Sequence, residues 1–303
     1  MASAVTETAP TVVPIVEDKI TLTGLAREPI KSNGSLDSFE SFDVTPIIGR
    51  EFPNANLKDF LPNSGREHSV KDDEISVISS ASREKLYKDR NPRKQTARRE
   101  WHSDITFEPI PSDYTLLRLT ELPKTGGDTL WASGYEIYDR ISEPYQKFLE
   151  SLTATYAQPG FNEVAKRNDF TIHPGPRGAP ENVGEELIAE HPVIRTNPVT
   201  GWKSVFAVGT HVQKVNGVSE EESRHLLDWF VTLIVENHDL QVRKRWENPN
   251  DLAIWDNRSV YHAATWDYDG LGPRTGHRAV GLGERPYLDP KSIGRREALE
   301  KSE

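Results

Sequence analysis

Short runs in which apolar and polar residues alternate occur throughout the chain and predict β-strands, because successive side chains of a strand point to opposite faces of a sheet. The predicted strands are 41–52, interpreted as a strand pair broken at Pro46 and Gly49, followed by 74–79, 114–120, 191–195, 204–208, 251–255, 259–264 and 278–282. The turn residues Asp256 and Asn257 predict that 251–255 and 259–264 form a hairpin. Many short strands with few helices favour a fold of the α+β or mainly β class, a double-stranded β-helix (jelly roll) with flanking helices.

Apolar residues spaced three or four apart predict helices in two regions. Ser133 and Glu136 form a capping box before the first helix, and Ser142 caps a second helix that follows it directly. The aromatic residues of these helices are interpreted as core. Ser219 and Glu222 cap an amphipathic helix, whose apolar face consists of Leu226, Leu227, Phe230, Leu233 and Ile234.

The remaining segments divide the chain into one domain and two ends. Residues 1–40 are predicted to be a disordered or irregular N-terminal segment, because they begin with a stretch rich in Thr and Pro. Residues 41–290 form the single domain, and 291–303 are a charged tail. Within the domain, 158–190 is rich in Gly, Pro and Asn, and a loop of this length is usually either a functional lid or disordered.

Composition excludes several classes of protein. A net charge of −10 in 303 residues argues against a nucleic-acid binder. The absence of cysteine excludes a disulfide scaffold, a thiolate zinc site and catalysis by a cysteine nucleophile. No apolar run has the length of a membrane helix, and residues 1–19 lack the pattern of a signal peptide. A cytoplasmic protein that does not act on membranes is therefore expected, and a homo-oligomer is compatible with these data.

His102 and Asp104 are separated by one residue, so both side chains can point the same way from an extended backbone. His262, on a strand near the C-terminus, supplies a third potential metal ligand. Two histidines and one carboxylate on one side of a metal form the facial triad of non-haem Fe(II) oxygenases. The alternative is a chance His-x-Asp pair, which is unremarkable in a chain with nine histidines.

Two arginines follow the third ligand. A 2-oxo acid that chelates iron needs a fixed cation for its distal carboxylate, and a guanidinium grips a carboxylate with two parallel hydrogen bonds. Arg274 and Arg278 are the candidates, and Thr129 can add a hydroxyl donor. The alternative for either arginine is a surface ion pair.

These residues belong to motifs that resemble the taurine dioxygenase family of Fe(II)/2-oxoglutarate-dependent enzymes, which includes fungal sulfonate dioxygenases. The motifs occur in the same order and consist of 101–107, 126–131, 254–258 with His262, and Arg274-x-x-His277-Arg278. The resemblance implies that His102, Asp104 and His262 are the iron ligands. It also implies that Thr129 and Arg274 bind 2-oxoglutarate, and that Arg278 and Ile105 contact the substrate.

The resemblance further implies Fe(II) as cofactor, with 2-oxoglutarate and O₂ as co-substrates. The substrate would be a small acidic organic molecule, for example a sulfonate such as taurine, whose hydroxylation releases sulfite. Because Asp104 is present, the site does not resemble the halogenase variant, which lacks this carboxylate.

Two departures from the family leave the substrate open. An early helix–strand unit is missing between residues 61 and 62, and Arg98 replaces a smaller polar residue of the substrate pocket. A shortened, catalytically silent member of the family is therefore one alternative. A non-oxidative metal-binding jelly-roll protein is another.

Overall fold

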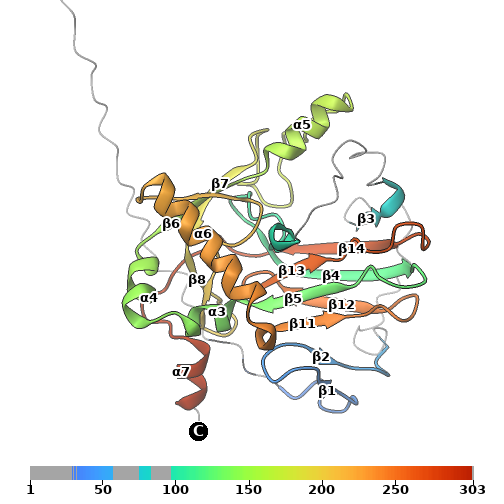
Figure 1. Ribbon diagram of the computed structural model, residues 1–303, viewed down its shortest axis with the longest axis horizontal. Helices are drawn as coiled ribbons and strands as arrows, with labels where there is room; N and C mark the ends of the chain where they lie inside the picture. The colour runs from blue at the N-terminus through green and yellow to red at the C-terminus, as the bar shows by residue number, and fades with distance from the viewer. Residues whose placement is uncertain (1–28, 30, 32, 57–74, 83–96, 302–303) are drawn as a thin grey trace, which may run out of the picture.

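Two antiparallel sheets stack on one side of the molecule, and a smaller sheet with helices forms the other side (Figure 1). The computed structural model describes residues 29, 31, 33–56, 75–82 and 97–301. The first sheet has the order β12-β4-β14-β3 (Leu252–Asp256, Ser112–Glu121, Thr275–Leu282 and Ile75–Ser79). The second has the order β11-β5-β13 (Gln241–Lys244, Thr129–Ser133 and Val260–Ala264). The strands predicted from alternation in 74–79, 114–120 and 278–282 are confirmed as β3, β4 and β14.

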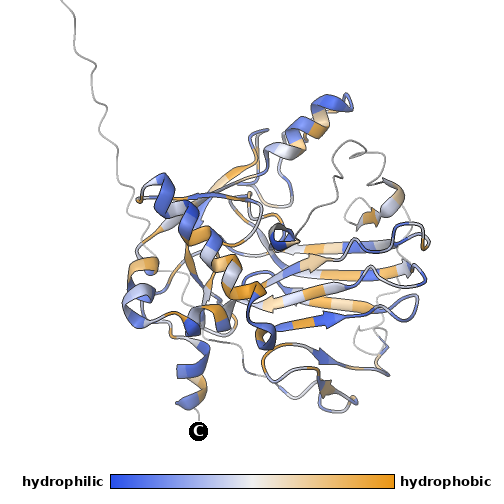
Figure 2. Cartoon of the chain, in the orientation of Figure 1, coloured by the Kyte–Doolittle hydropathy of each residue, from blue (hydrophilic) through white to orange (hydrophobic). Residues whose placement is uncertain are grey.

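A hydrophobic cluster fills the space between these two sheets. Along β4, Leu117 and Leu119 are buried while Arg118 is exposed, as the alternation requires. Their side chains pack with Trp255 of β12 and with Trp131 of β5 in the second sheet. Figure 2 shows apolar positions within the strands and mostly hydrophilic loops at their ends. Burial of large apolar side chains on the facing sides of two sheets is therefore what holds the sheets together.

The predicted hairpin of 251–264 is wrong in its pairing, although both strands exist. β12 pairs with β4 in the first sheet, and β13 pairs with β5 in the second. The connection crosses from one sheet to the other at Asn257, whose side chain donates to Ser112 Oγ (2.9 Å) and Thr115 Oγ1 (2.8 Å). These bonds attach the turn to β4, so the two strands separate instead of pairing with each other.

The other side of the molecule contains most of the helices. A sheet of order β10-β6-β7 (Val212–Val215, Thr153–Ala157 and Ile188–Pro192) lies beside the hairpin β8-β9 (Ile194–Thr196 and Lys203–Val205). The helices that follow β5 are α3 (Gly134–Arg140), α4 (Glu143–Glu150), α5 (Pro159–Arg167), α6 (Glu220–Val235) and α7 (Arg295–Glu300). A 3-10 turn, η1 (Arg98–Glu100), precedes β4, and a second, η2 (His238–Leu240), precedes β11. The predicted strand pair in 41–52 is confirmed as β1 (Phe42–Asp43) and β2 (Arg50–Glu51). No helix in the described ranges is long and apolar enough to cross a lipid bilayer.

The predicted helix caps and the predicted burial both agree with the structure only in part. Ser142 occupies the N-cap position of α4, but its side chain makes no capping hydrogen bond. Ser219 and Glu222 make both bonds of the capping box of α6, and Ser133 accepts from the backbone of Glu136 in α3. On α4, however, Tyr145 and Phe148 are 53% and 41% exposed, so they are not core. The helix lies at the surface and buries Leu149 alone.

Two helices lie where none was expected. The stretch 158–190 contains α5, whose Pro159 suits the first turn of a helix, so the prediction of a continuous loop is wrong there. The charged tail contains α7, where Arg295 and Arg296 form ion pairs with the buried Glu136 of α3. The junction between residues 61 and 62 lies outside the described residues.

Candidate metal centre and co-substrate site

The three predicted ligands lie together, although two of them are far from the third in sequence. Ligand atoms of His102, Asp104 and His262 lie within 4.8 Å of one another. His102 and His262 face each other across an antiparallel bridge, with His102 N donating to His262 O (3.0 Å) and His262 N donating to His102 O (2.8 Å). This backbone pair sets both imidazoles side by side at the edge of β13.

Hydrogen bonds to neighbouring groups orient two of these side chains. His102 Nδ1 lies 2.7 Å from the carbonyl of Glu100, which can only accept, so Nδ1 carries the proton and Nε2 is left for a metal. Asp104 Oδ2 accepts from Thr115 Oγ1 at 2.9 Å. Two imidazoles and a carboxylate arranged in this way match the donor set that holds Fe(II) with open positions for other ligands.

The residues around Asp104 stabilise its ionised form. Burial alone would raise its pKa, but the Arg278 guanidinium, His262, His102 and the Thr115 hydroxyl together outweigh burial and lower the pKa to about 2. Arg278 Nη1 donates to Asp104 Oδ1 at 2.7 Å. Arg278, predicted to bind substrate, therefore lies at the site, where it is paired with a predicted metal ligand.

Three buried histidines make the stability of the metal-free protein depend on pH. Burial is the main reason that the pKa of His191, His211 and His262 is lowered to about 3. Between about pH 6.5 and 3 the unfolded chain binds these protons and the folded chain does not, so stability falls as the pH falls. Below about pH 6, each histidine that stays neutral in the folded chain should contribute up to about 1.4 kcal/mol per pH unit to this loss.

Denaturant unfolding of the metal-free protein between pH 7 and 5 checks this expectation. The variant His191→Gln should reduce the change of the free energy of unfolding with pH by the contribution of one histidine. The variant His225→Gln, at an exposed position of α6, should leave this pH dependence unchanged. A stability that is flat over this range would contradict the expectation.

Arg274 and Thr129 form a second buried group next to the triad, because β5 pairs with β13 and Thr129 lies opposite Ala264, two residues after His262. Arg274 Nε donates to Gly127 O (2.8 Å), and its Nη2 donates to Thr129 Oγ1 (3.4 Å). Burial lowers the pKa of Arg274, and no carboxylate in the described part of the chain lies within ion-pair distance of it. A buried guanidinium without an ionic partner fits a carboxylate ligand.

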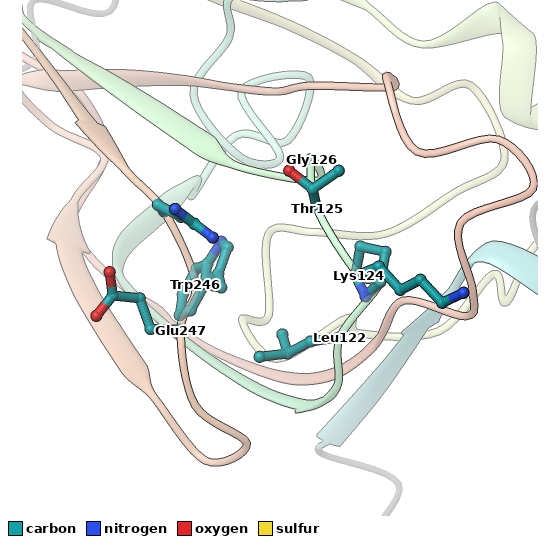
Figure 3. A pocket seen from close by; sticks show the side chains of 8 residues that line it. Leu122, Lys124, Thr125, Gly126, Trp246 and Glu247 are labelled. Carbon is teal, nitrogen blue, oxygen red and sulfur yellow. The ribbon is translucent and has the colours of Figure 1, made fainter.

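Sequence reasoning missed Trp246, whose indole Nε1 also donates to Thr129 Oγ1 (3.1 Å). With its oxygen already accepting two bonds, the Thr129 hydroxyl is free to donate its own proton to a ligand. Figure 3 shows Trp246 lining a pocket together with Leu122, Lys124, Thr125, Gly126 and Glu247. None of the three predicted metal ligands lines this pocket.

Ile105 lies in the turn directly after Asp104. Its φ of 46° is rarely adopted by a β-branched residue and is strained. Arg98, expected to line the substrate pocket, has its guanidinium against α6, where it donates to Asp228 O (2.6 Å) and to Thr232 Oγ1.

Gly209 allows the chain to pass close to His102, the first of the predicted ligands. Its φ is +108°, and a Cβ there would lie 2.6 Å from Trp101 O and 2.8 Å from His102 Cα. Gly184 has a similar φ of +86° but no atom within 4 Å of a Cβ. We expect Gly209→Ala to lower the free energy of unfolding by about 1–3 kcal/mol more than Gly184→Ala, because only the first adds overpacking to backbone strain. Denaturant unfolding of both variants measures this difference, and equal losses would show that the contact with His102 is not tight.

Comparison with known proteins agrees with this geometry. Residues 47–280 match the model of the taurine catabolism dioxygenase TauD, TfdA family. The alpha-ketoglutarate-dependent dioxygenase btcD of Neocamarosporium betae is 46% identical, with 90% of this chain and 99% of the relative aligned. The alpha-ketoglutarate-dependent sulfonate dioxygenase of Saccharomyces cerevisiae is 34% identical over 64% of this chain and 44% of its own length.

Among solved structures, a taurine dioxygenase from Burkholderia xenovorans superposes with a TM-score of 0.56 at 25% identity. The match covers 75% of this chain and 67% of that structure. Alpha-ketoglutarate is 2-oxoglutarate, the molecule for which Arg274 and Thr129 were predicted. The chain belongs to the TauD/TfdA family and is a 2-oxoglutarate-dependent dioxygenase, an oxidoreductase that uses Fe(II), 2-oxoglutarate and O₂.

Proposed function

We propose that His102, Asp104 and His262 hold the Fe(II), and that the enzyme hydroxylates a small acidic organic substrate. The observation that supports this most directly is the convergence of the three side chains within 4.8 Å in the described residues. With Asp104 ionised and the His262 ring neutral at pH 7, both side chains are in the protonation state that a metal requires.

Arg274 and Thr129 bind 2-oxoglutarate in this proposal. The guanidinium meets the distal carboxylate, and the Thr129 hydroxyl donates to the same group, because neither has another anionic partner in the described residues. When bound, iron, 2-oxoglutarate and O₂ supply the oxidising chemistry and yield succinate and CO₂. The residues of the chain position these groups and shield them from water.

Arg278 orients the acidic group of the substrate. Its side chain is 27% exposed, and its Nε is buried with no partner among the described residues. An anion would satisfy that donor, and a sulfonate such as taurine is one candidate, in line with the name of the yeast relative. Ile105, in the turn directly after Asp104, is proposed to line the substrate site.

The arrangement of strands supports a double-stranded β-helix. From β3 to β5 the chain alternates between the two sheets, with His102 bridging to β13 in the second sheet on the way. After the helical insertion, β11 to β14 alternate in the same manner, so early and late strands alternate within each sheet. Because of this strand order, His102 pairs with His262, and β4 pairs with β14, which carries Arg278.

We also propose that residues 41–290 form one domain in which an early helix–strand unit is missing. The alignment with btcD is 344 residues long although 90% of this 303-residue chain takes part in it, so the relative contains residues without a counterpart here. This length difference is also the observation that favours the second candidate, a shortened and catalytically silent protein.

One experiment separates the candidates. Anaerobic addition of Fe(II) and 2-oxoglutarate should produce the visible charge-transfer band of the chelate, and O₂ should then give succinate with a sulfonate, sulfate ester or carboxylate substrate. A folded protein that gives neither the band nor succinate would support the silent protein. Turnover with Zn(II) or Mn(II) but not with Fe(II) would support a non-oxidative metal-dependent protein.

A further inference from the structure

Two histidines outside the triad lie behind the turn that carries Asp104. His191 comes from β7 and is 1% exposed, and His211 precedes β10 and is also buried. Both belong to the helical side of the molecule, far in sequence from the turn at 103–108. They connect that side to the proposed metal centre.

His191 binds two backbone carbonyls of this turn. Its Nε2 lies 3.0 Å from Thr106 O and 3.1 Å from Glu108 O. A carbonyl only accepts, so Nε2 carries the proton and donates to both. The imidazole is fixed by packing against Tyr156 (4.9 Å between ring centroids) and Phe206 (5.8 Å).

His211 holds the opposite side of the same turn. Its Nδ1 lies 2.9 Å from Thr106 Oγ1, and its ring meets Phe107 edge to face at 5.0 Å. Asn257 Oδ1 accepts from the backbone N–H of Asp104 at 3.0 Å. The turn is therefore held from several sides by residues that are distant in sequence.

The turn needs this support because its own sequence does not favour its shape. Ile105 has a φ of 46°, which costs about 1–3 kcal/mol for a residue with a Cβ. Such a conformation persists only where surrounding contacts impose it. The two carbonyls that His191 binds lie one and three residues after Ile105, so its hydrogen bonds act directly on the strained segment.

We propose that His191 is a positioning residue of the metal centre, which holds the turn at 104–108 so that Asp104 faces His102 and His262. This inference rests on the proposed metal site. The feature that does the positioning is the neutral N–H donor, so a side chain that presents an amide N–H in the same place can substitute for it.

Metal affinity measured without turnover tests the proposal. Mn(II) binding, followed by the electron paramagnetic resonance signal of free Mn(II), should weaken by about 10-fold in His191→Phe, the low end of the range for loss of a direct partner of a metal ligand, because His191 acts through the backbone of Thr106 and Glu108. His191→Gln should restore affinity to within about threefold, because its amide keeps the donor. The exposed His225→Gln is the matched control. The charge-transfer band with Fe(II) and 2-oxoglutarate should weaken in parallel.

Two results would overturn the proposal. A folded His191→Phe protein with the affinity of the wild type would show that the donor is dispensable, and a Gln variant as weak as Phe would show that ring packing matters instead. If the Phe variant does not fold, His191→Met, whose flexible side chain adapts to the site, replaces it in the comparison. A wild-type protein that binds no metal would instead refute the proposed metal site itself.

Discussion

Replacing His262 by glutamine is expected to reduce Fe(II)-dependent succinate formation to the level seen without metal. The substitution removes one of the three proposed ligand atoms and keeps most of the side-chain volume in a site where His262 is 8% exposed. The backbone bridge to His102 does not depend on the side chain, so the second imidazole stays in place. Because the loss of a mere partner of a ligand costs 10–100-fold in affinity or activity, loss of a ligand should cost at least about 100-fold.

Two measurements make this result specific. Anaerobic titration with Fe(II) and 2-oxoglutarate should show no charge-transfer band in His262→Gln and an unchanged band in His225→Gln, on the exposed side of α6. Thermal unfolding of the metal-free proteins shows whether the fold survives. A folded His262→Gln protein with a normal band would mean that this histidine is not a ligand.

The local parts of the fold follow from local patterns in the sequence. Alternation along β4 and the capping box of α6 depend on residues within a few positions of one another. The same holds for the pair His102 and Asp104, whose separation of one residue already places both on one side of the chain. Short-range physical constraints are enough to predict these features.

Pairing between distant strands could not be predicted in the same way. The segments of β12 and β13 have the pattern of a hairpin, yet each strand has a better neighbour in its own sheet, and Asn257 ties the crossing to β4. A single sequence contains no signal for this choice. The prediction that the aromatic residues of α4 are core was wrong for a similar reason. Whether Tyr145 is exposed depends on which other parts of the chain cover it.

His191 was missed as a residue that supports the site because it acts through backbone groups. His191 binds the carbonyls of Thr106 and Glu108, and a carbonyl is present at every position whatever the side chain. No motif can mark such a contact. The three proposed ligands could be named from the sequence because metal chemistry demands particular side chains, whereas the contact of His191 depends on the completed fold.

Substitution of Arg274 by methionine is expected to weaken 2-oxoglutarate binding without removing the metal. The guanidinium is 4% exposed and bonded to Gly127 and Thr129, neither of which is a predicted metal ligand. Loss of one partner of a buried charge pair costs about 2–5 kcal/mol, so the Kd for 2-oxoglutarate should rise by about 30-fold or more. Arg274→Lys should recover only part of this, because an ammonium cannot make two parallel bonds to a carboxylate.

The control for this experiment is Arg118→Gln, on the exposed face of β4, which should leave 2-oxoglutarate binding unchanged. Mn(II) affinity should be unaffected in both variants, which separates loss of the co-substrate from loss of the metal site. Arg278→Gln provides the opposite test, because its guanidinium is paired with Asp104 and is proposed to meet the substrate. If 2-oxoglutarate affinity falls in Arg278→Gln and not in Arg274→Met, the two arginines have the reverse of the roles proposed for them.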